Sequence, residues 1–242
     1  MIERMKRLLT RTIWALTKQL EAGDFVPVAY EMRFENGKID RVDLCKDKDK
    51  VYVKVLDYKT GSKAFDVVAL YHGLQLQLMV YMDAAVKMTQ KHYPDKEVIP
   101  AGVFYYRLND PLVEKKVVGE EEEIWQKVLK ELKVDGVMNL KDETLEHLDH
   151  CQAGESAVIP VKYNKNGSLS KNSKVASEQE FEVMMRHALG KVLKVHRKIL
   201  SGEVAAFPYR RKQESGCDYC AYRHICGFDQ KIPGYKYRDI LR

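Results

Sequence analysis

Three motifs decide the fold of this chain: G-K-I-D-R-V-D at residues 37–43, V-L-D-Y-K-T-G at residues 55–61 and G-L-Q-L-Q-L-M-V-Y at residues 73–81. Asp40 and Asp57 lie in the first two motifs, and Lys59 follows Asp57 by two positions. Because side chains alternate across a strand, Asp57 and Lys59 are expected to project from one face. A carboxylate pair beside a cation at a sheet edge can hold a hard divalent ion and orient a water against a phosphate.

The segments around these motifs alternate between extended and helical patterns. Turn signals separate three β-rich segments that predict an antiparallel meander, at residues 25–34, 38–46 and 51–59. Residues 66–93 have apolar side chains at helical spacing and are predicted to form one long helix. A β-rich run at 98–108 can then join the sheet as a parallel strand after this crossover. We therefore predict an α/β fold with a central mixed sheet flanked by helices.

Apolar periodicity predicts three further helices, over residues 2–21, 120–134 and 178–200. Ser177 and Glu180 match a capping box at the start of the last one. The segment 135–177 lacks a regular period and is predicted to be irregular. The expected organisation is one domain and a tail packed on it: residues 1–206, with a core at about 25–108 and an extension at 109–206, and residues 207–242.

The composition excludes several classes of protein. The 242 residues carry a formal net charge of +6, which mildly favours anionic partners, and 45% of them are hydrophobic. We find no apolar run of membrane-spanning length and no secretory signal, so we expect a cytoplasmic protein without membrane contact. The sequence also lacks a G-x-x-x-x-G-K-[ST] loop, so we expect no ATP hydrolysis by this segment.

Several polar side chains are candidate nucleic-acid contacts. They lie beside the third motif, in the polar loop 163–174 and in the tail: Gln75, Lys165, Lys171, Lys174, Arg210, Arg211 and Lys212. Lysine and arginine can neutralise phosphates, but a basic loop or helix face is more often simply solvated. Both interpretations stay open at the sequence level.

Three of the five cysteines are crowded in the tail, at Cys217, Cys220 and Cys226. Three thiolates so close in sequence could supply most of a zinc or iron–sulfur site, and their spacing does not choose between the two metals. Cys45 is expected to be a strand residue, because free cysteine packs as a small hydrophobic side chain.

Together, the motifs resemble those of the PD-(D/E)xK nuclease superfamily, in the branch of the RecB-type nuclease domains. Residues 37–43 resemble its first acidic motif, D-Y-K-T-G at 57–61 its D-x-K motif, and Gln77 with Tyr81 its Q-x-x-x-Y motif. The whole chain is similar to the carboxyl-terminal nuclease region of the B subunits of AddAB-type helicase–nucleases. That similarity includes S-x-S-K-x-S-x-V-A-S at 168–177 and C-D-Y-C-A-Y-R-H-I-C-G-F-D at 217–229.

This resemblance implies a restriction-endonuclease-like fold and a metal-dependent deoxyribonuclease that acts in double-strand-break repair and recombination. Asp40, Asp57 and the main-chain carbonyl of Tyr58 would bind Mg²⁺ or Mn²⁺, and Lys59 would orient the attacking water. Gln77 and Tyr81 would position the DNA strand or brace the site. The implied partners are single-stranded DNA or unwound duplex ends and the A-type subunit of a helicase–nuclease.

The resemblance also implies two ligands upstream of the nuclease core: a metal-coordinating histidine, and a fourth cysteine that joins Cys217, Cys220 and Cys226 around a [4Fe–4S] cluster. Neither has a counterpart at the family position in this sequence. We therefore expect an amino-terminally truncated piece whose cluster is absent or incomplete. The alternative to an active nuclease is a catalytically idle DNA-binding or structural module.

Overall fold

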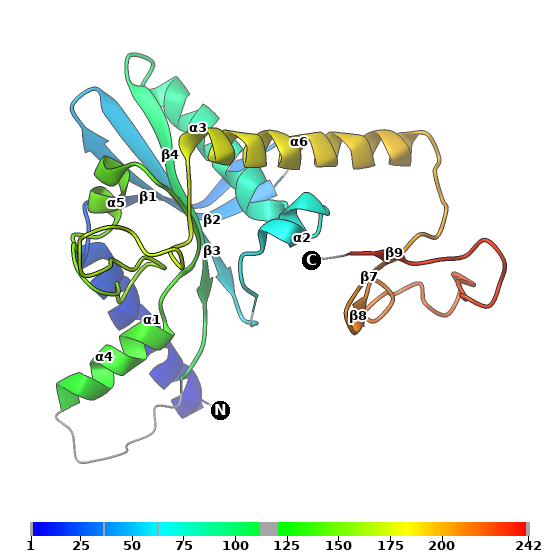
Figure 1. Cartoon of the computed structure of the whole chain (residues 1–242), viewed down its shortest axis with the longest axis horizontal. Helices are drawn as coiled ribbons and strands as arrows, with labels where there is room; N and C mark the ends of the chain where they lie inside the picture. Colours follow the sequence, from blue (N-terminus) through cyan, green and yellow to red (C-terminus); the bar gives the residue numbers. More distant parts are fainter. Residues whose placement is uncertain (1, 36, 62, 112–120, 241–242) are drawn as a thin grey trace.

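The computed structural model describes residues 2–35, 37–61, 63–111 and 121–240, and a six-stranded mixed sheet lies at its centre (Figure 1). In sheet order the strands are β1 (Val26–Phe34), β2 (Gly37–Asp47), β3 (Lys50–Lys59), β4 (Glu97–Arg107), β5 (Asp135–Asn139) and β6 (Val175–Ala176). The first three form the predicted antiparallel meander, and β4 pairs with β3 in parallel. The predicted α/β architecture is confirmed.

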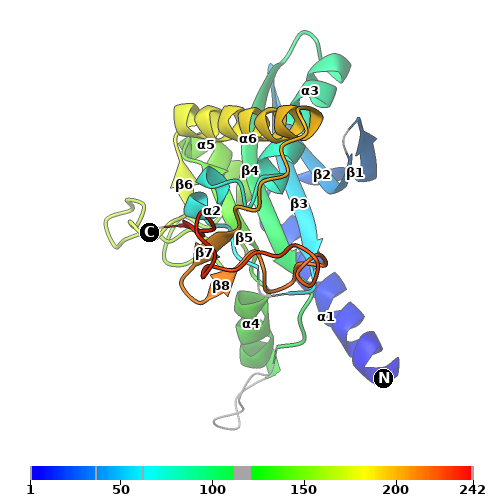
Figure 2. The same cartoon turned by 90° about the vertical axis from the view of Figure 1, so that its right-hand side faces the viewer.

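Helices cover both faces of this sheet, as Figure 2 shows from the side. Apolar residues of one face pack against α1 (Ile2–Glu21), α4 (Glu121–Glu131) and α5 (Asp142–Leu148). The other face packs against α2 (Val67–Tyr71), α3 (Gln77–His92) and α6 (Glu178–Leu200). Valines of β3 alternate into this second core, which follows from the period of two in a strand. Asp57 and Lys59, at the end of β3, continue this alternation. Their side chains therefore lie on the face that α3 covers.

The prediction of one long helix over 66–93 is wrong. The helix divides into α2 and α3, and Gly73 between them has a φ of +84°, a conformation that glycine adopts without steric cost. The Gly73 and Leu74 amides donate back to the carbonyls of Leu70 and Ala69, which closes α2. As a result α3 begins at Gln77, and the helix starts at the residue that the third motif singles out.

The prediction that residues 135–177 are irregular is also wrong. The segment contains β5, α5 and β6, and β5 joins β4 in antiparallel and β6 in parallel pairing. These elements are short and are held by partners distant in sequence, so they have little local period. Glu120, the predicted start of the preceding helix, and Asn36 of the predicted turn lie outside the described residues.

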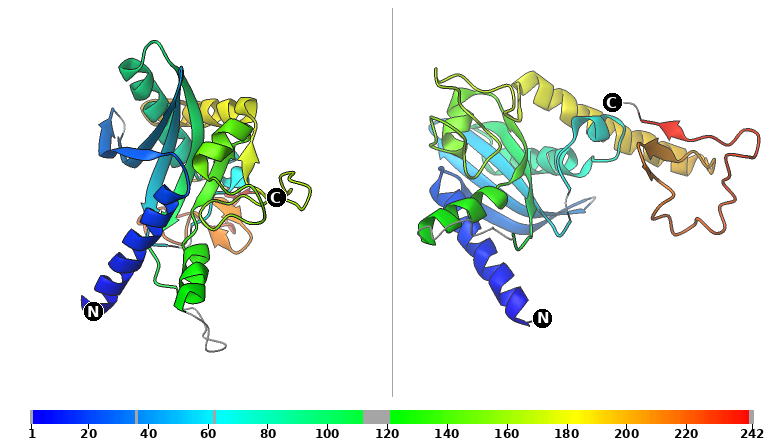
Figure 3. Two further views of the ribbon diagram at one scale, coloured as in Figure 1. Left: turned by 90° about the vertical axis from the view of Figure 1, so that its left-hand side faces the viewer. Right: turned by 60° about the horizontal axis from the view of Figure 1, so that its bottom comes forward.

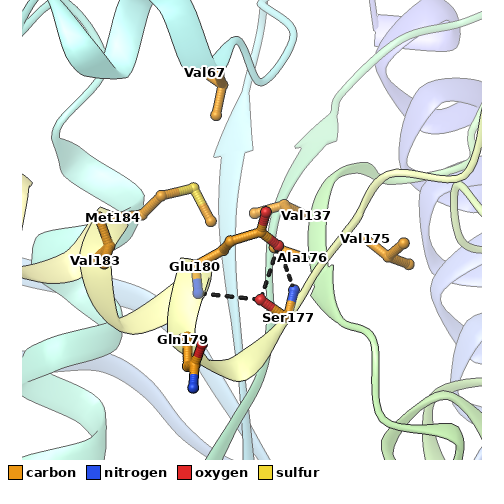
Figure 4. Close-up of a pocket in the computed structure, with 9 residues that line it drawn as sticks. All are labelled: Val67, Val137, Val175, Ala176, Ser177, Gln179, Glu180, Val183 and Met184. Carbon is orange, nitrogen blue, oxygen red and sulfur yellow. Dashed lines mark hydrogen bonds between the residues drawn. The ribbon is translucent and has the colours of Figure 1, made fainter.

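The capping box at the start of α6 is confirmed. The Glu180 amide donates to the Ser177 hydroxyl, and the Glu180 carboxylate accepts from the Ser177 amide at 2.7 Å (Figure 4). An open hollow lies beside this turn and is lined by side chains of α2, β5, β6 and α6, among them Val67, Val137 and Met184. Its acidic group is already used by the cap, so the hollow offers mainly apolar contact.

The tail follows the far end of α6, which leads away from the sheet (Figure 3), and Figure 1 shows the tail turning back below that helix. It forms a small sheet of its own in the order β8 (Glu214–Ser215), β7 (Tyr209–Arg211) and β9 (Arg238–Asp239). Arg211 reaches back to the core and pairs with Asp66, the N-cap of α2, at 2.6 Å. None of the described helices is both long enough and apolar enough to span a membrane.

Candidate active site

The two motif carboxylates meet at the end of the β2–β3 ladder. The β2–β3 register ends at the pair Arg41 and Leu56, so Asp40 and Asp57 lie directly beyond the last pair. Asp57 continues the alternation of Val53 and Val55 and therefore points to the face that α3 covers, and the charge of Asp40 acts on it from nearby. The main-chain amide of Tyr58 donates to Asp40 Oδ2 at 2.9 Å, which fixes the first carboxylate against the second strand. The geometry thus brings together the pair that the sequence predicted.

Asp57 is buried, with 1% of its surface exposed. Its Oδ2 atom lies 2.6 Å from Lys59 Nζ, yet it accepts no well-directed hydrogen bond from the described residues. Burial raises the pKa of Asp57, and the charge of Asp40 raises it further, whereas Lys59 lowers it. The two carboxylates carry more negative charge than the Lys59 ammonium beside Asp57 can neutralise. These two residues therefore fit a hard divalent cation.

A chain of polar contacts links the carboxylates to α3. Lys59 Nζ donates to Gln77 Oε1 at 3.0 Å, and Gln77 Nε2 donates to the Tyr81 hydroxyl at 2.8 Å. The Tyr81 ring packs edge-on against Phe34 of β1, with centroids 5.7 Å apart. Gln77 thus positions the ammonium group, and Tyr81 positions Gln77.

Gln75 lies in a different environment from Gln77. Its Nε2 donates to the Ala64 carbonyl at 2.9 Å, and its Oε1 accepts from the Asp66 amide at 3.1 Å. Both partners belong to the loop between β3 and α2. Gln75 therefore holds this loop, whereas Gln77 is the glutamine that contacts Lys59.

Two residues near Asp57 were missed by the sequence analysis. Tyr105 is the register partner of Asp57 in the parallel β3–β4 ladder, and its ring lies 5.8 Å from Lys59 Nζ and 5.5 Å from Lys63 Nζ. Burial lowers the pKa of Lys63, as does the charge of Lys59. The sequence did hold a signal for Tyr105, because this residue lies in the predicted parallel strand 98–108. The carboxyl ends of neighbouring parallel strands meet at one sheet edge, so Tyr105 could have been expected near Asp57.

Three of the six basic residues predicted to contact nucleic acid form ion pairs within the chain. Lys174 pairs with Asp135, Arg210 with Asp239, and Arg211 with Asp66. The remaining three, Lys165, Lys171 and Lys212, are exposed. Contact of any of these residues with nucleic acid stays a prediction.

The five cysteines do not assemble a common site. Cys217 is half-buried in the tail, Cys220 and Cys226 are exposed, and Cys45 is buried in β2, as predicted for a strand residue. Within the described chain, two groups of three or more acidic, histidine or cysteine side chains have ligand atoms within 4.8 Å of one another, and neither includes a tail cysteine. An iron–sulfur cluster at Cys217, Cys220 and Cys226 therefore stays a prediction from the resemblance, and we derive no chemistry from one.

Neither of those two groups includes Asp40 or Asp57. Of the histidines, His72 is nearest to the motifs in sequence, but it caps the end of α2. Burial and the charges of Arg238, Lys191 and Arg211 lower the pKa of His72, so its surroundings are basic. Within the described residues, further ligands for an ion at Asp40 and Asp57 would come from main-chain oxygens or solvent.

Comparison with known proteins agrees with this geometry. Residues 1–227 match the PD-(D/E)XK nuclease superfamily. Relatives named as the B subunit of an ATP-dependent helicase/deoxyribonuclease come from Lachnoclostridium phytofermentans, at 40% identity, and from Clostridium kluyveri, at 34% identity. A third, from Caldanaerobacter subterraneus subsp. tengcongensis, is 32% identical. Each match covers 98% of this chain and 22% of the relative's length, so the chain spans about a fifth of these relatives.

Proposed function

The chain belongs to the PD-(D/E)XK nuclease superfamily, and we propose that it is the metal-dependent deoxyribonuclease module of a helicase–nuclease that processes DNA ends in double-strand-break repair. The observation that carries the proposal is the proximity of Asp40 and Asp57 at the end of the β2–β3 ladder, with Lys59 paired to Asp57. The names of the relatives support the helicase–nuclease context. The substrates we propose are single-stranded DNA and unwound duplex ends, and the partner is the A-type subunit of that complex.

Asp40 and Asp57 would hold Mg²⁺ or Mn²⁺, with the Tyr58 carbonyl as a further oxygen donor. The ion would supply charge neutralisation at the scissile phosphate and a more acidic water. The two carboxylates are pre-positioned for this role, because the β2–β3 ladder and the Tyr58 amide fix them before any ligand arrives. Such fixed geometry lowers the reorganisation that the reaction requires.

Lys59 supplies the positive charge that the protein itself contributes. Of the three N–H bonds of its ammonium group, one donates to Gln77, and the ion pair with Asp57 occupies a second side of the group. The third can reach the attacking water or a phosphate oxygen. In the hydrolysis the water oxygen bonds to phosphorus, the phosphorus–oxygen bond to the leaving strand breaks, and a proton passes to the leaving oxygen. Lys59 orients the water and stabilises the charge on the phosphate oxygens.

The second candidate is a DNA-binding or structural module whose nuclease centre is idle. The observation in its favour is that, among the described residues, no third acidic or histidine side chain joins Asp40 and Asp57 within metal-ligand reach. This candidate predicts DNA binding without cleavage.

The experiment that separates the candidates measures cleavage of a labelled single-stranded oligonucleotide by the purified chain, with Mg²⁺ or Mn²⁺ and with EDTA. The test variant is Asp57→Ala/Lys59→Ala. The matched control is Asp83→Ala/Lys87→Ala, which removes an exposed ion pair of α3. Fluorescence anisotropy of the same oligonucleotide measures binding in parallel.

The nuclease proposal expects metal-dependent cleavage in the wild type and the control, with loss of at least about 100-fold in the test variant. Cleavage that survives in the test variant would overturn the assignment of the site. Binding without cleavage in all three proteins would instead support the idle module.

A further inference from the structure

A second group of metal-binding side chains lies at the opposite end of the sheet. Asp47 ends β2, and Glu143 and His147 are one turn apart on α5, so they share one face of that helix. Asp47 is seven residues along β2 from Asp40, a separation of about 23 Å at 3.3 Å per residue. The group is therefore distinct from the candidate active site and does not depend on the proposed function.

A hydrogen bond at the Nδ1 atom of His147 fixes the orientation of its ring. Its Nδ1 atom lies 2.8 Å from Asp24 Oδ2, and Asp24 Oδ1 lies 2.9 Å from His150 Nε2. Because a carboxylate only accepts hydrogen bonds, the proton of the neutral His147 ring is on Nδ1. The Tyr52 ring packs against the imidazole at 4.9 Å between centroids and holds its tilt.

This tautomer leaves the lone pair of His147 on Nε2. The Nε2 atom is buried and makes no hydrogen bond to the described residues, and the carboxylate oxygen Oδ2 of Asp47 lies 3.9 Å from it. Asp47, Glu143 and His147 each place a ligand atom within 4.8 Å of the other two. Two carboxylates and one imidazole lone pair therefore face one another, and the Lys50 ammonium contacts this group only at Glu143 among the described residues, an arrangement that a further cation would stabilise.

We propose that Asp47, Glu143 and His147 bind a divalent transition-metal ion of the zinc class. An imidazole nitrogen with two carboxylates favours such an ion over Mg²⁺ or Ca²⁺, which prefer oxygen ligands alone. Asp24 then supplies the outer carboxylate that ligating histidines usually have. Bound at about 2.1 Å from each donor, the ion would draw the three ligand atoms together by less than about 1.5 Å.

Cys45 is not part of this set. It lies within 4.8 Å of Asp24 and His147 ligand atoms, but its side chain is buried in the core, and the Nδ1 atom of His147 is already bonded to Asp24. Lys50 is the natural competitor of the ion, because its Nζ lies 2.7 Å from Glu143 Oε2. Removing the Lys50 charge is therefore expected to tighten metal binding.

The test compares Zn²⁺ bound per chain after equilibrium dialysis in the wild type, Asp47→Asn, His147→Gln and Lys50→Met. The matched control is His150→Gln, which removes a histidine that contacts the same Asp24 from outside the group. The tail thiols and the candidate active site are common to all five proteins, so differences between them report this group alone. Unfolding in EDTA checks that each variant is folded.

We expect Asp47→Asn and His147→Gln each to lose one equivalent of Zn²⁺, His150→Gln to keep it, and Lys50→Met to bind it more tightly. In ¹⁵N spectra of the histidine rings, Zn²⁺ should shift Nε2 of His147 and leave its Nδ1 protonated. Equal zinc content in the wild type, Asp47→Asn and His147→Gln overturns the proposal. So does a loss in His150→Gln as large as that in His147→Gln.

Discussion

The ammonium group of Lys59 donates a hydrogen bond of 3.0 Å to the side-chain carbonyl of Gln77. This contact joins the last residue of β3 to the first residue of α3. The helix predicted over 66–93 is interrupted, and its second part, α3, begins at Gln77. The contact forms because this start of α3 faces the end of β3. The interruption at Gly73 is therefore part of the architecture of the site.

We predict that Gln77→Met lowers the cleavage rate about 10- to 100-fold with little change in KM for DNA. Methionine keeps the bulk of glutamine but accepts no hydrogen bond from Lys59, so the ammonium loses one of its two fixed directions. Single-turnover cleavage of a labelled oligonucleotide measures the effect. Gln90→Met is the control, because Gln90 is exposed near the end of the same helix and bonds only main-chain carbonyls.

A rise in KM without a fall in rate would assign Gln77 to DNA binding and contradict its role in holding Lys59. Equal cleavage rates for Gln77→Met and Gln90→Met would show that the Lys59–Gln77 hydrogen bond does not contribute to cleavage.

We predict that Asp43→Asn destabilises the fold by about 3 kcal/mol or more. Asp43 is fully buried and accepts from Arg41 at 2.6 and 2.8 Å. Lys54 Nζ lies 3.0 Å away, so this one carboxylate serves two buried cations. The neutral amide leaves both charges uncompensated. Urea unfolding, followed by fluorescence, measures the loss, and Asp83→Asn on the exposed side of α3 should change stability by less than about 0.5 kcal/mol.

The ion pairs between α1 and the end of β4 predict a pH dependence of stability. Hydrogen bonding from Arg7 lowers the pKa of Asp110, and Arg11 adds to the effect. A carboxylate with a lowered pKa stabilises the fold fully above its unfolded pKa near 4, and the stabilisation is lost as pH falls through the folded value. The free energy of unfolding of the wild type should thus exceed that of Asp110→Asn by about 1 kcal/mol at pH 6. The gap should close near pH 2, and a gap independent of pH would contradict this assignment.

The elements with strong local signals were predictable from the sequence. The β1–β3 meander, the helices α1 and α6 and the capping box of Ser177 each depend on periodicity or on residues a few positions apart. By contrast, β5 has only five residues and is stabilised by pairing with β4 and β6, which no local window contains. The break at Gly73 was missed because the apolar spacing continues on both sides of it.

The same distinction applies to the candidate site. Asp40, Asp57, Lys59 and Gln77 lie within motifs, and short contacts link them at one end of the sheet, whereas their roles stay predictions. Tyr105 and Lys63 reach the site through the parallel β3–β4 register and the loop after β3, and neither lies in a motif. The engagement of Lys174 and Arg211 with Asp135 and Asp66 likewise depends on long-range packing that charge counting cannot reveal.

Gly136 of β5 and Gly190 of α6 offer a matched test of how closely β5 packs on β4, with Gly190 as the control. A Cβ atom on Gly136 would lie 1.9 Å from the Val103 carbonyl oxygen, so Gly136→Ala must displace β5 from β4 and should cost about 3 kcal/mol. Gly190 lies within α6 with no atom within 4 Å of an added Cβ, and alanine there should stabilise the fold by up to about 1 kcal/mol. The contact between Trp14 of α1 and Trp125 of α4, at 4.6 Å, provides a fluorescence signal for unfolding of the core. A Gly136→Ala variant as stable as wild type would mean that β5 does not pair with β4 as closely as described.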